Sequence, residues 1–331
     1  MRLFNRGLKT LIAPLACLLL AGAWNGAAYG QEEYPAKPIR LMVPFPPGGP
    51  ADVLSRVVAR KLSDGLGQQM LVENRPGAGG TTAMETVSKS APDGYTIGLG
   101  SNSTFAIAPS LYRRLGYDPF KSFAPVSLIA RSRSVIVINA AVPANSLQEF
   151  IALAKKQPRQ LNFGSNGNGT IPHLASLLFQ SMTGTKFVHV PYKGVAPMTK
   201  DLIAGQVQVA FIISAGLDKQ VQAGKLKALA VAGPKRLPQL PDVPTAAEAG
   251  LPGFETYTWF GMAVPQGTPG PIIQRINAAL HRSLVDKDVQ KVLVSQGFEA
   301  EATTPEQFGQ YITAEAEKWS PIVKASGMKV D

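Results

Sequence analysis

Three glycine-rich segments each combine the end of a predicted strand, small residues and the start of a predicted helix. They are residues 43–52 (VPFPPGGPAD), 99–105 (LGSNSTF) and 163–170 (FGSNGNGT). Glycine lets a ligand approach the backbone, and the first helical turn offers unpaired N–H groups and the positive end of the helix dipole. Such a turn holds a carboxylate without a side-chain cation. Any single turn of this kind is more often a plain helix cap than a site, but with three such turns in one chain both interpretations stay open here.

The second and third turns add hydroxyl and amide groups at the ends of strands, where open α/β sheets bind their ligands. His173 follows the third turn near a helix start, where it either approaches a bound anion or packs the helix. A fourth segment of the same form, residues 74–81, either lines the site or is a structural turn. Trp259 beside Phe260 is compatible with an aromatic wall or with core packing.

Alternating strand and helix patterns must position these turns. Helical patterns separate the predicted buried strands, and the clearest helix spans 52–63, where Asp52 is placed to cap the start. Ser146 with Glu149, and Thr245 with Glu248, have capping-box spacing ahead of helical segments. Strand followed by helix, repeated, indicates an α/β fold with largely parallel sheets in two domains. The predicted strands are 39–43, 70–72, 95–99, 135–138, 161–163, 187–190, 207–213 and 228–231.

Several classes of function lack their sequence signatures. There is no phosphate-binding P-loop, no dinucleotide fingerprint and no G-x-S-x-G nucleophile elbow. The three histidines have no metal-ligand spacing, so we expect no metal and no cofactor. Lys and Arg are scattered without aromatic interleaving, which argues against nucleic acid as a partner although the net charge is +11.

Residues 1–30 have the pattern of a secretory signal peptide, with three basic residues, an apolar run from residue 11 to 23 and small residues before residue 31. Cleavage there removes Cys17, the only cysteine, and leaves a net charge of +8 on about 301 residues. No later stretch is long and apolar enough to span a bilayer. We therefore expect a periplasmic protein without disulfides.

Ordered motifs along the chain resemble the Bug family, the periplasmic solute-binding proteins of tripartite tricarboxylate transporters. The motifs are YPAKPIR (34–40), VPFPPGG (43–49), ENRPGAGG (73–80), PDGYT (92–96), GNGT (167–170), HVPYKG (189–194) and LPDVPT (240–245).

The resemblance implies a type II periplasmic binding fold, with two α/β domains around a ligand cleft and two chain crossings near Ala130 and Phe254. The domains are then 31–130 with 254–331, and 131–253. It further implies a monomer without catalytic residues that hands a small organic carboxylate to the transporter's membrane subunits. The candidate ligand-binding residues are Phe45, Gly48, Gly49, Ala51, Asp52, Ser103, Thr104, Phe105, Ser165, Asn166, Gly169, Thr170, His173, Ile212 and Trp259.

Two departures from the family pattern concern the ligand. Phe105 stands where the family's second turn often carries His, and Ile212 stands where many relatives carry an Asp able to pair with an amino group. An amino-acid ligand is therefore disfavoured. We expect an apolar or aromatic carboxylate, with Phe105, Ile212 and Trp259 around its body.

Two alternatives remain on the sequence alone. One is a sensor that binds its ligand between the same two domains and signals to a membrane partner. A secreted hydrolase is the other, and its only nucleophile and base pair would be Ser165 with His173.

Overall fold

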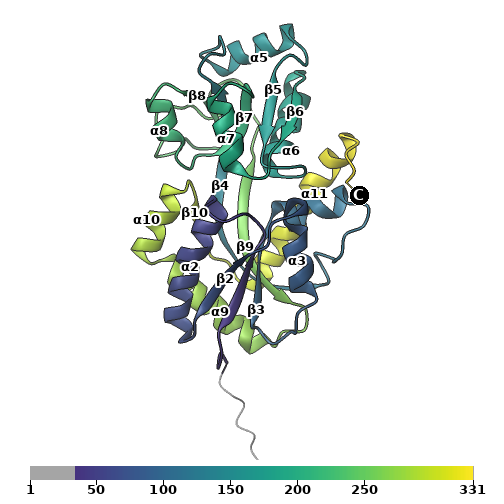
Figure 1. Ribbon diagram of the computed structural model, residues 1–331, viewed down its shortest axis with the longest axis vertical. Helices are drawn as coiled ribbons and strands as arrows, with labels where there is room; N and C mark the ends of the chain where they lie inside the picture. Colours follow the sequence, from purple (N-terminus) through teal and green to yellow (C-terminus); the bar gives the residue numbers. More distant parts are fainter. Residues whose placement is uncertain (1–33, 331) are drawn as a thin grey trace, which may run out of the picture. The chain divides into compact units, whose positions relative to one another are not determined.

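The computed structural model describes residues 34–330, so the predicted signal peptide and Cys17 lie outside the described residues. The chain from Lys37 onward forms one compact unit, drawn in Figure 1. Its strands are β1 (Ile39–Val43), β2 (Met70–Asn74), β3 (Thr96–Ser101), β4 (Phe123–Asn139), β5 (Asn162–Ser165), β6 (Val188–Pro191), β7 (Val209–Ile213), β8 (Leu226–Ala232), β9 (Tyr257–Pro265) and β10 (Glu299–Ala300).

Helices connect most of these strands. The α-helices are α2 (Pro50–Leu66), α3 (Thr81–Ser88), α4 (Ala108–Leu111), α5 (Leu147–Lys156), α6 (Ile171–Thr183), α7 (Val195–Ile203), α8 (Leu217–Gln222), α9 (Gly270–Leu284), α10 (Lys287–Ser295) and α11 (Pro305–Ala325). A 3-10 turn, η1 (Ala78–Gly80), and a short π-helix, η2 (Asn102–Ile107), complete the set.

The strands of the described residues form one sheet in the order β2-β1-β3-β9-β4-β7-β5-β6, and the long strand β4 divides it into two sections. In the first section β2, β1 and β3 are parallel, while β9 runs antiparallel to β3 and to residues 123–133 of β4. In the second section residues 134–139 of β4 pair antiparallel with β7 and β8, and β7, β5 and β6 are parallel. Figure 1 shows β4 and β9 running through the middle of the molecule.

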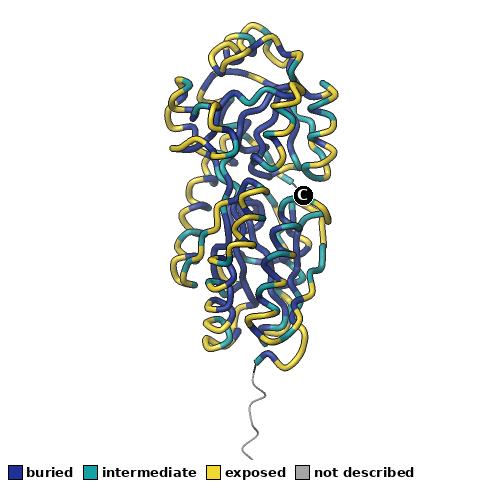
Figure 2. Tube along the Cα trace, turned by 90° about the vertical axis from the view of Figure 1, so that its left-hand side faces the viewer, coloured by how far each residue is buried: buried dark blue, intermediate teal, exposed yellow. Residues whose placement is uncertain are grey.

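Each section has its own apolar core. Figure 2 shows buried residues in the interior of the trace and exposed residues on its outer turns. In the first section Trp259, Phe308 and Trp319 are packed together, and in the second Phe150, Phe179 and Phe211 lie in one cluster. A further cluster on the second section contains Val135, Leu202 and Ile212. Burial of large apolar side chains on both sheet sections stabilises the fold.

The predicted α/β architecture is confirmed, but the sheet is mixed rather than largely parallel, because β4 and β9 pair antiparallel with their neighbours. Two local predictions also need correction. Gly49, not Asp52, is the N-cap of α2, which begins at Pro50. Thr245 and Glu248 exchange the two bonds of a capping box, but no helix follows them. Gly250 adopts a φ of 86° and Pro252 comes soon after, so the chain turns here instead of continuing as a helix. The predicted domain boundaries stay a prediction.

Candidate functional site

A cavity of about 300 Å³ is lined by residues of both sheet sections. That volume falls at the lower end of the range for small-molecule sites. The lining consists of four chain segments, 45–51, 101–103, 170–172 and 193–197, together with Asn166, Ile212, Ile213, Thr258 and Phe260.

The first turn presents the start of α2 to this cavity. It follows the carboxyl end of β1, and Gly48 adopts a φ of 79° that favours glycine. Pro50 occupies the first helical turn, and the N–H of Ala51 lies where the helix itself supplies no acceptor. Of the residues predicted here, Phe45, Gly48, Gly49 and Ala51 line the cavity.

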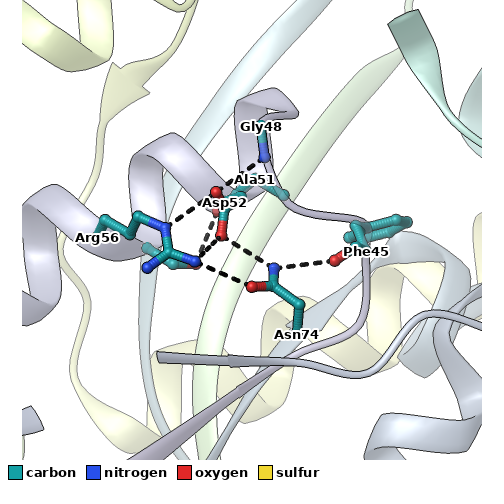
Figure 3. Close-up of polar contacts among 7 residues, drawn as sticks. Phe45, Gly48, Ala51, Asp52, Arg56 and Asn74 are labelled. Carbon is teal, nitrogen blue, oxygen red and sulfur yellow. Dashed lines mark hydrogen bonds and ion pairs between the residues drawn. The ribbon is translucent and has the colours of Figure 1, made fainter. Parts of the chain in front are cut away.

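Asp52 does not line the cavity. It stabilises the first turn instead, and Figure 3 shows its contacts with Gly48, Arg56 and Asn74. Its carboxylate accepts hydrogen bonds from Gly48 N (2.9 Å), Arg56 Nε (3.0 Å) and Asn74 Nδ2 (2.9 Å). The Asn74 amide also donates to Phe45 O at 3.0 Å. Burial raises the pKa of Asp52, but the donors from Arg56, Gly48 and Asn74 outweigh it and lower that pKa below its ordinary value.

The second turn brings only part of its predicted residues to the site. Ser103 lines the cavity, whereas Thr104 and Phe105 are fully buried and lie outside the lining. The Phe105 ring packs edge to face on Phe123 at 5.2 Å, and a Cβ at Gly100 would collide with that ring. Phe105 is therefore a core residue, and the expectation that it surrounds the ligand needs correction.

Trp259 is also a core residue. Its side chain is fully buried, stands edge to face with Phe308 at 5.7 Å, and donates from Nε1 to Glu315 Oε2 at 2.9 Å. Because successive strand residues point to opposite faces, the neighbouring Phe260 faces the cavity instead. Phe260 also meets Phe45 edge to face at 5.8 Å. The period of two in β9 was the signal that would have identified Phe260.

Only part of the residues predicted in the third turn line the cavity. Asn166 and Thr170 line the cavity, whereas Ser165, Gly169 and His173 lie behind it. Ser165 is fully buried, and its Oγ lies 2.7 Å from His189 Nε2. The pair of Ser165 with His173 named for a hydrolase is thus not formed, because His189 on the adjacent strand β6 takes that position.

His173 and His189 form a stacked pair behind the third turn. Their ring centroids are 3.9 Å apart, and His189 stacks on Phe163 at 4.5 Å. Burial, together with His189, lowers the pKa of His173 to about 3, and burial lowers that of His189 to about 4. His173 Nδ1 accepts from Gly169 N at 3.3 Å. Both rings are neutral near pH 7, so His173 positions the turn and supplies no charge to an anion.

The second section contributes the rest of the lining. Ile212, as predicted, lies in the wall beside Ile213. The start of α7, from Lys193 to Pro197, also lines the cavity and was not among the predicted site residues. Gly194 caps α7 with a φ of 126°, and the HVPYKG motif at this point was the available signal.

The electrostatics of the lining favour an anion. Three helices, α2, α6 and α7, present their N-termini to one cavity, and each terminus carries roughly half a positive charge. Among the described residues no Asp or Glu lines it, and Lys193 is the charged residue in the lining. The remaining wall is largely apolar, with Phe45, Phe260 and Ile212 exposed to the cavity.

Residues 34–330 contain no cluster of three or more His, Cys, Asp or Glu side chains suited to a metal ion. No helix among them has the length and apolar character that a membrane span requires.

Comparison with known proteins gives the family. Residues 54–328 match the family described as "Tripartite tricarboxylate transporter family receptor". The chain belongs to this receptor family. The receptor family thus confirms the resemblance seen in the ordered motifs, and it is a family of solute-binding proteins rather than of enzymes.

Three solved structures are similar to this receptor. The R. palustris protein Rpa4515 with adipate shares 35% identity, with a TM-score of 0.85 over 90% of this chain and all of that one. The periplasmic binding protein BugD shares 34% identity, with a TM-score of 0.83 over 90% of this chain and all of BugD. MatC from Rhodopseudomonas palustris with bound malate shares 33% identity, with a TM-score of 0.82 over 88% of this chain and all of MatC. The predicted Bug family and its periplasmic binding fold are confirmed.

Proposed function

We propose that this receptor binds a small organic carboxylate with an apolar or aromatic body and delivers it to a tripartite tricarboxylate transporter. The cavity lining carries this proposal, because it combines three helix N-termini with apolar walls and contains no Asp or Glu. The similar proteins with adipate and malate bound support a carboxylate as the ligand class. No bond is made or broken in this function.

The proposed ligand sits among residues from both sheet sections. Backbone N–H groups near Gly49 and Ala51, with Asn166 and Thr170 opposite, hold the carboxylate, and Phe45, Ile212 and Phe260 surround its body. Phe260 therefore makes the contact with the ligand body that was predicted for Phe105 and Trp259. Contacts to both sections favour a closed arrangement, so the ligand drives hinge closure between domains 31–130 with 254–331 and 131–253.

The cellular setting belongs to the same proposal. We place the receptor in the periplasm as a monomer, released from its signal peptide and paired with the membrane subunits of the transporter. The similarity to the periplasmic binding protein BugD supports this location.

A thermal-shift screen tests the ligand class. Benzoate and hexanoate at saturating concentration are expected to raise the melting temperature, because only a ligand that binds the folded state stabilises it. Aspartate and citrate are expected to have no effect, since Ile212 offers no partner to an ammonium group and the walls are apolar. Stabilisation by amino acids or citrate with none by benzoate-like acids contradicts the proposal.

Substitution of Ile212 sharpens the screen. Ile212→Asp puts a carboxylate into the wall, so benzoate binding should be lost by repulsion while an amino acid gains a partner for its ammonium group. Ile212→Asn is the matched control, because it adds the same polarity without the charge. If both variants bind benzoate equally well, Ile212 does not face the ligand.

A further inference from the structure

Lys193 is a cation at the cavity that has no partner in the described structure. It is exposed, lines the cavity, and directly precedes Gly194, the N-cap of α7. The acidic residue on α7, Asp201, does not pair with Lys193. Its Oδ2 accepts a hydrogen bond from the Tyr192 hydroxyl at 2.8 Å. No salt bridge of the described residues includes Lys193, so its ammonium group is available to a ligand.

The charge presented to the cavity exceeds what one carboxylate balances. Each of the three helix N-termini contributes roughly half a positive charge, and Lys193 adds a full one. No acidic residue lines the cavity among the described residues. Asp52 lies behind the wall with its carboxylate bonded to Gly48, Arg56 and Asn74. The three termini together carry about one and a half positive charges, and Lys193 raises the total to about two and a half, which suits a dianion better than a monoanion.

The position of Lys193 makes its charge effective across the cavity. A Cβ added at Gly194 would lie 3.9 Å from Pro46 Cγ, so the segment bearing Lys193 in the second section closely approaches the first turn. A ligand held on the N–H groups of the first turn therefore lies between two sources of positive charge. The apolar residues Phe45, Phe260 and Ile212 also line the cavity and suit a hydrocarbon chain.

We propose that Lys193 is a specificity-determining residue that selects dicarboxylates over monocarboxylates by pairing with the second carboxylate of the ligand. The inference rests on the proposed function, because it assumes that backbone N–H groups hold one carboxylate in this cavity. It adds the residue that distinguishes two ligand charges. The pair forms in a partly enclosed space, where water screens it less than on an open surface.

Calorimetric titration of two matched acids tests this proposal. Adipate and hexanoate have the same six-carbon length and differ in the second carboxylate. The wild-type protein is expected to bind adipate more tightly. Lys193→Gln should weaken adipate binding by about five- to tenfold and hexanoate binding by about twofold at most. Retained hexanoate binding shows that the variant is folded, and the adipate preference of the wild type should shrink as salt is raised.

Lys200→Gln is the matched control, because Lys200 is an exposed lysine on the same helix but outside the cavity lining. It should leave both affinities unchanged. An adipate-to-hexanoate ratio that is the same in Lys193→Gln as in the wild type overturns the inference, and so does an equal loss for both acids, which indicates general attraction. If the wild type binds hexanoate at least as tightly as adipate, the inference fails while the proposed function stands. If it binds neither of these acids nor benzoate, the proposed function fails as well.

Discussion

The first and third turns have similar backbones, but the side chains that support the first are charged and those that support the third are neutral. Both follow the carboxyl end of a parallel strand, both lead into a helix with proline in its first turn, and both line one cavity. The first is held by the charged network of Asp52, Arg56 and Asn74. The third is held by the neutral stack of His173 and His189.

The difference shows that a ligand-facing turn depends on its backbone, while the residues behind it are free to vary in charge. The two supports should then fail in different pH ranges. Asp52 has a lowered pKa, so its contribution is complete above the ordinary value near 4 and is lost only in stronger acid. The histidine pair also has lowered pKa values, and its contribution starts to fall near pH 6.5, where unfolded histidine takes up protons.

Removal of Asp52 should have the largest effect. Asp52→Ala leaves the first turn without three hydrogen bonds, and we expect a loss of about 3 kcal/mol in unfolding free energy and roughly a tenfold loss in benzoate affinity. Urea denaturation and calorimetric titration measure the two quantities. Glu306→Ala is the matched control, because Glu306 is an exposed acidic residue in the first turn of α11. If Asp52→Ala is as mild as this control, the network does not support the turn.

The histidine pair should dominate the pH dependence between pH 7 and 5. Both folded pKa values lie below the unfolded value of about 6.5, so the unfolded state binds more protons as the pH falls, and stability falls with it. We expect each ring to contribute a loss of about 2 kcal/mol in unfolding free energy over this range, measured by urea denaturation.

His189→Asn should flatten that pH dependence, because one of the two buried rings no longer titrates. His281→Asn is the control, since His281 lies on α9 and its ring contacts Thr303 O instead of another histidine. Equal slopes for wild type and His189→Asn would show that the stack does not stay neutral in the folded protein.

Loss of the Ser165 hydroxyl should have the smallest effect of the three. Ser165→Ala removes the contact with His189 Nε2 and is expected to cost about 1 kcal/mol in unfolding free energy. Benzoate affinity should change by about twofold at most, because Ser165 is buried behind the cavity wall. Ser110→Ala, which removes a bond to Ser320 on another part of the chain, is the comparison. Ester hydrolysis by the wild type that disappears in Ser165→Ala would revive the hydrolase alternative.

Local patterns were sufficient to predict the backbone of the site. Glycine and proline after a buried strand placed Gly48, Gly49 and Ala51 at a helix start, and the run of apolar residues in β7 placed Ile212 near a strand end. These features depend on dihedral preferences and hydrophobic periodicity, which act over a few residues. For the same reason the α/β architecture was predictable.

The positions of the side chains behind the site could not be predicted from local sequence, because they depend on contacts between distant segments. Asp52 points inward because Asn74, on a neighbouring strand, lies beside it, and His189 replaces His173 at Ser165 because β5 and β6 are adjacent. Phe105 and Trp259 are aromatic residues in suitable segments, but packing on Phe123 and Phe308 buries them. The period of two in β9 separates the faces of Trp259 and Phe260, but only contacts between elements decide which face lies in the core.

The central claim is that helix N-termini at an apolar cavity hold a carboxylate, and titration of benzoate against benzamide tests it most directly. The two molecules share shape and apolar surface and differ in the negative charge. Benzoate is expected to bind with one molecule per chain, whereas benzamide gives no measurable binding. Equal binding of the amide and the acid would contradict the account.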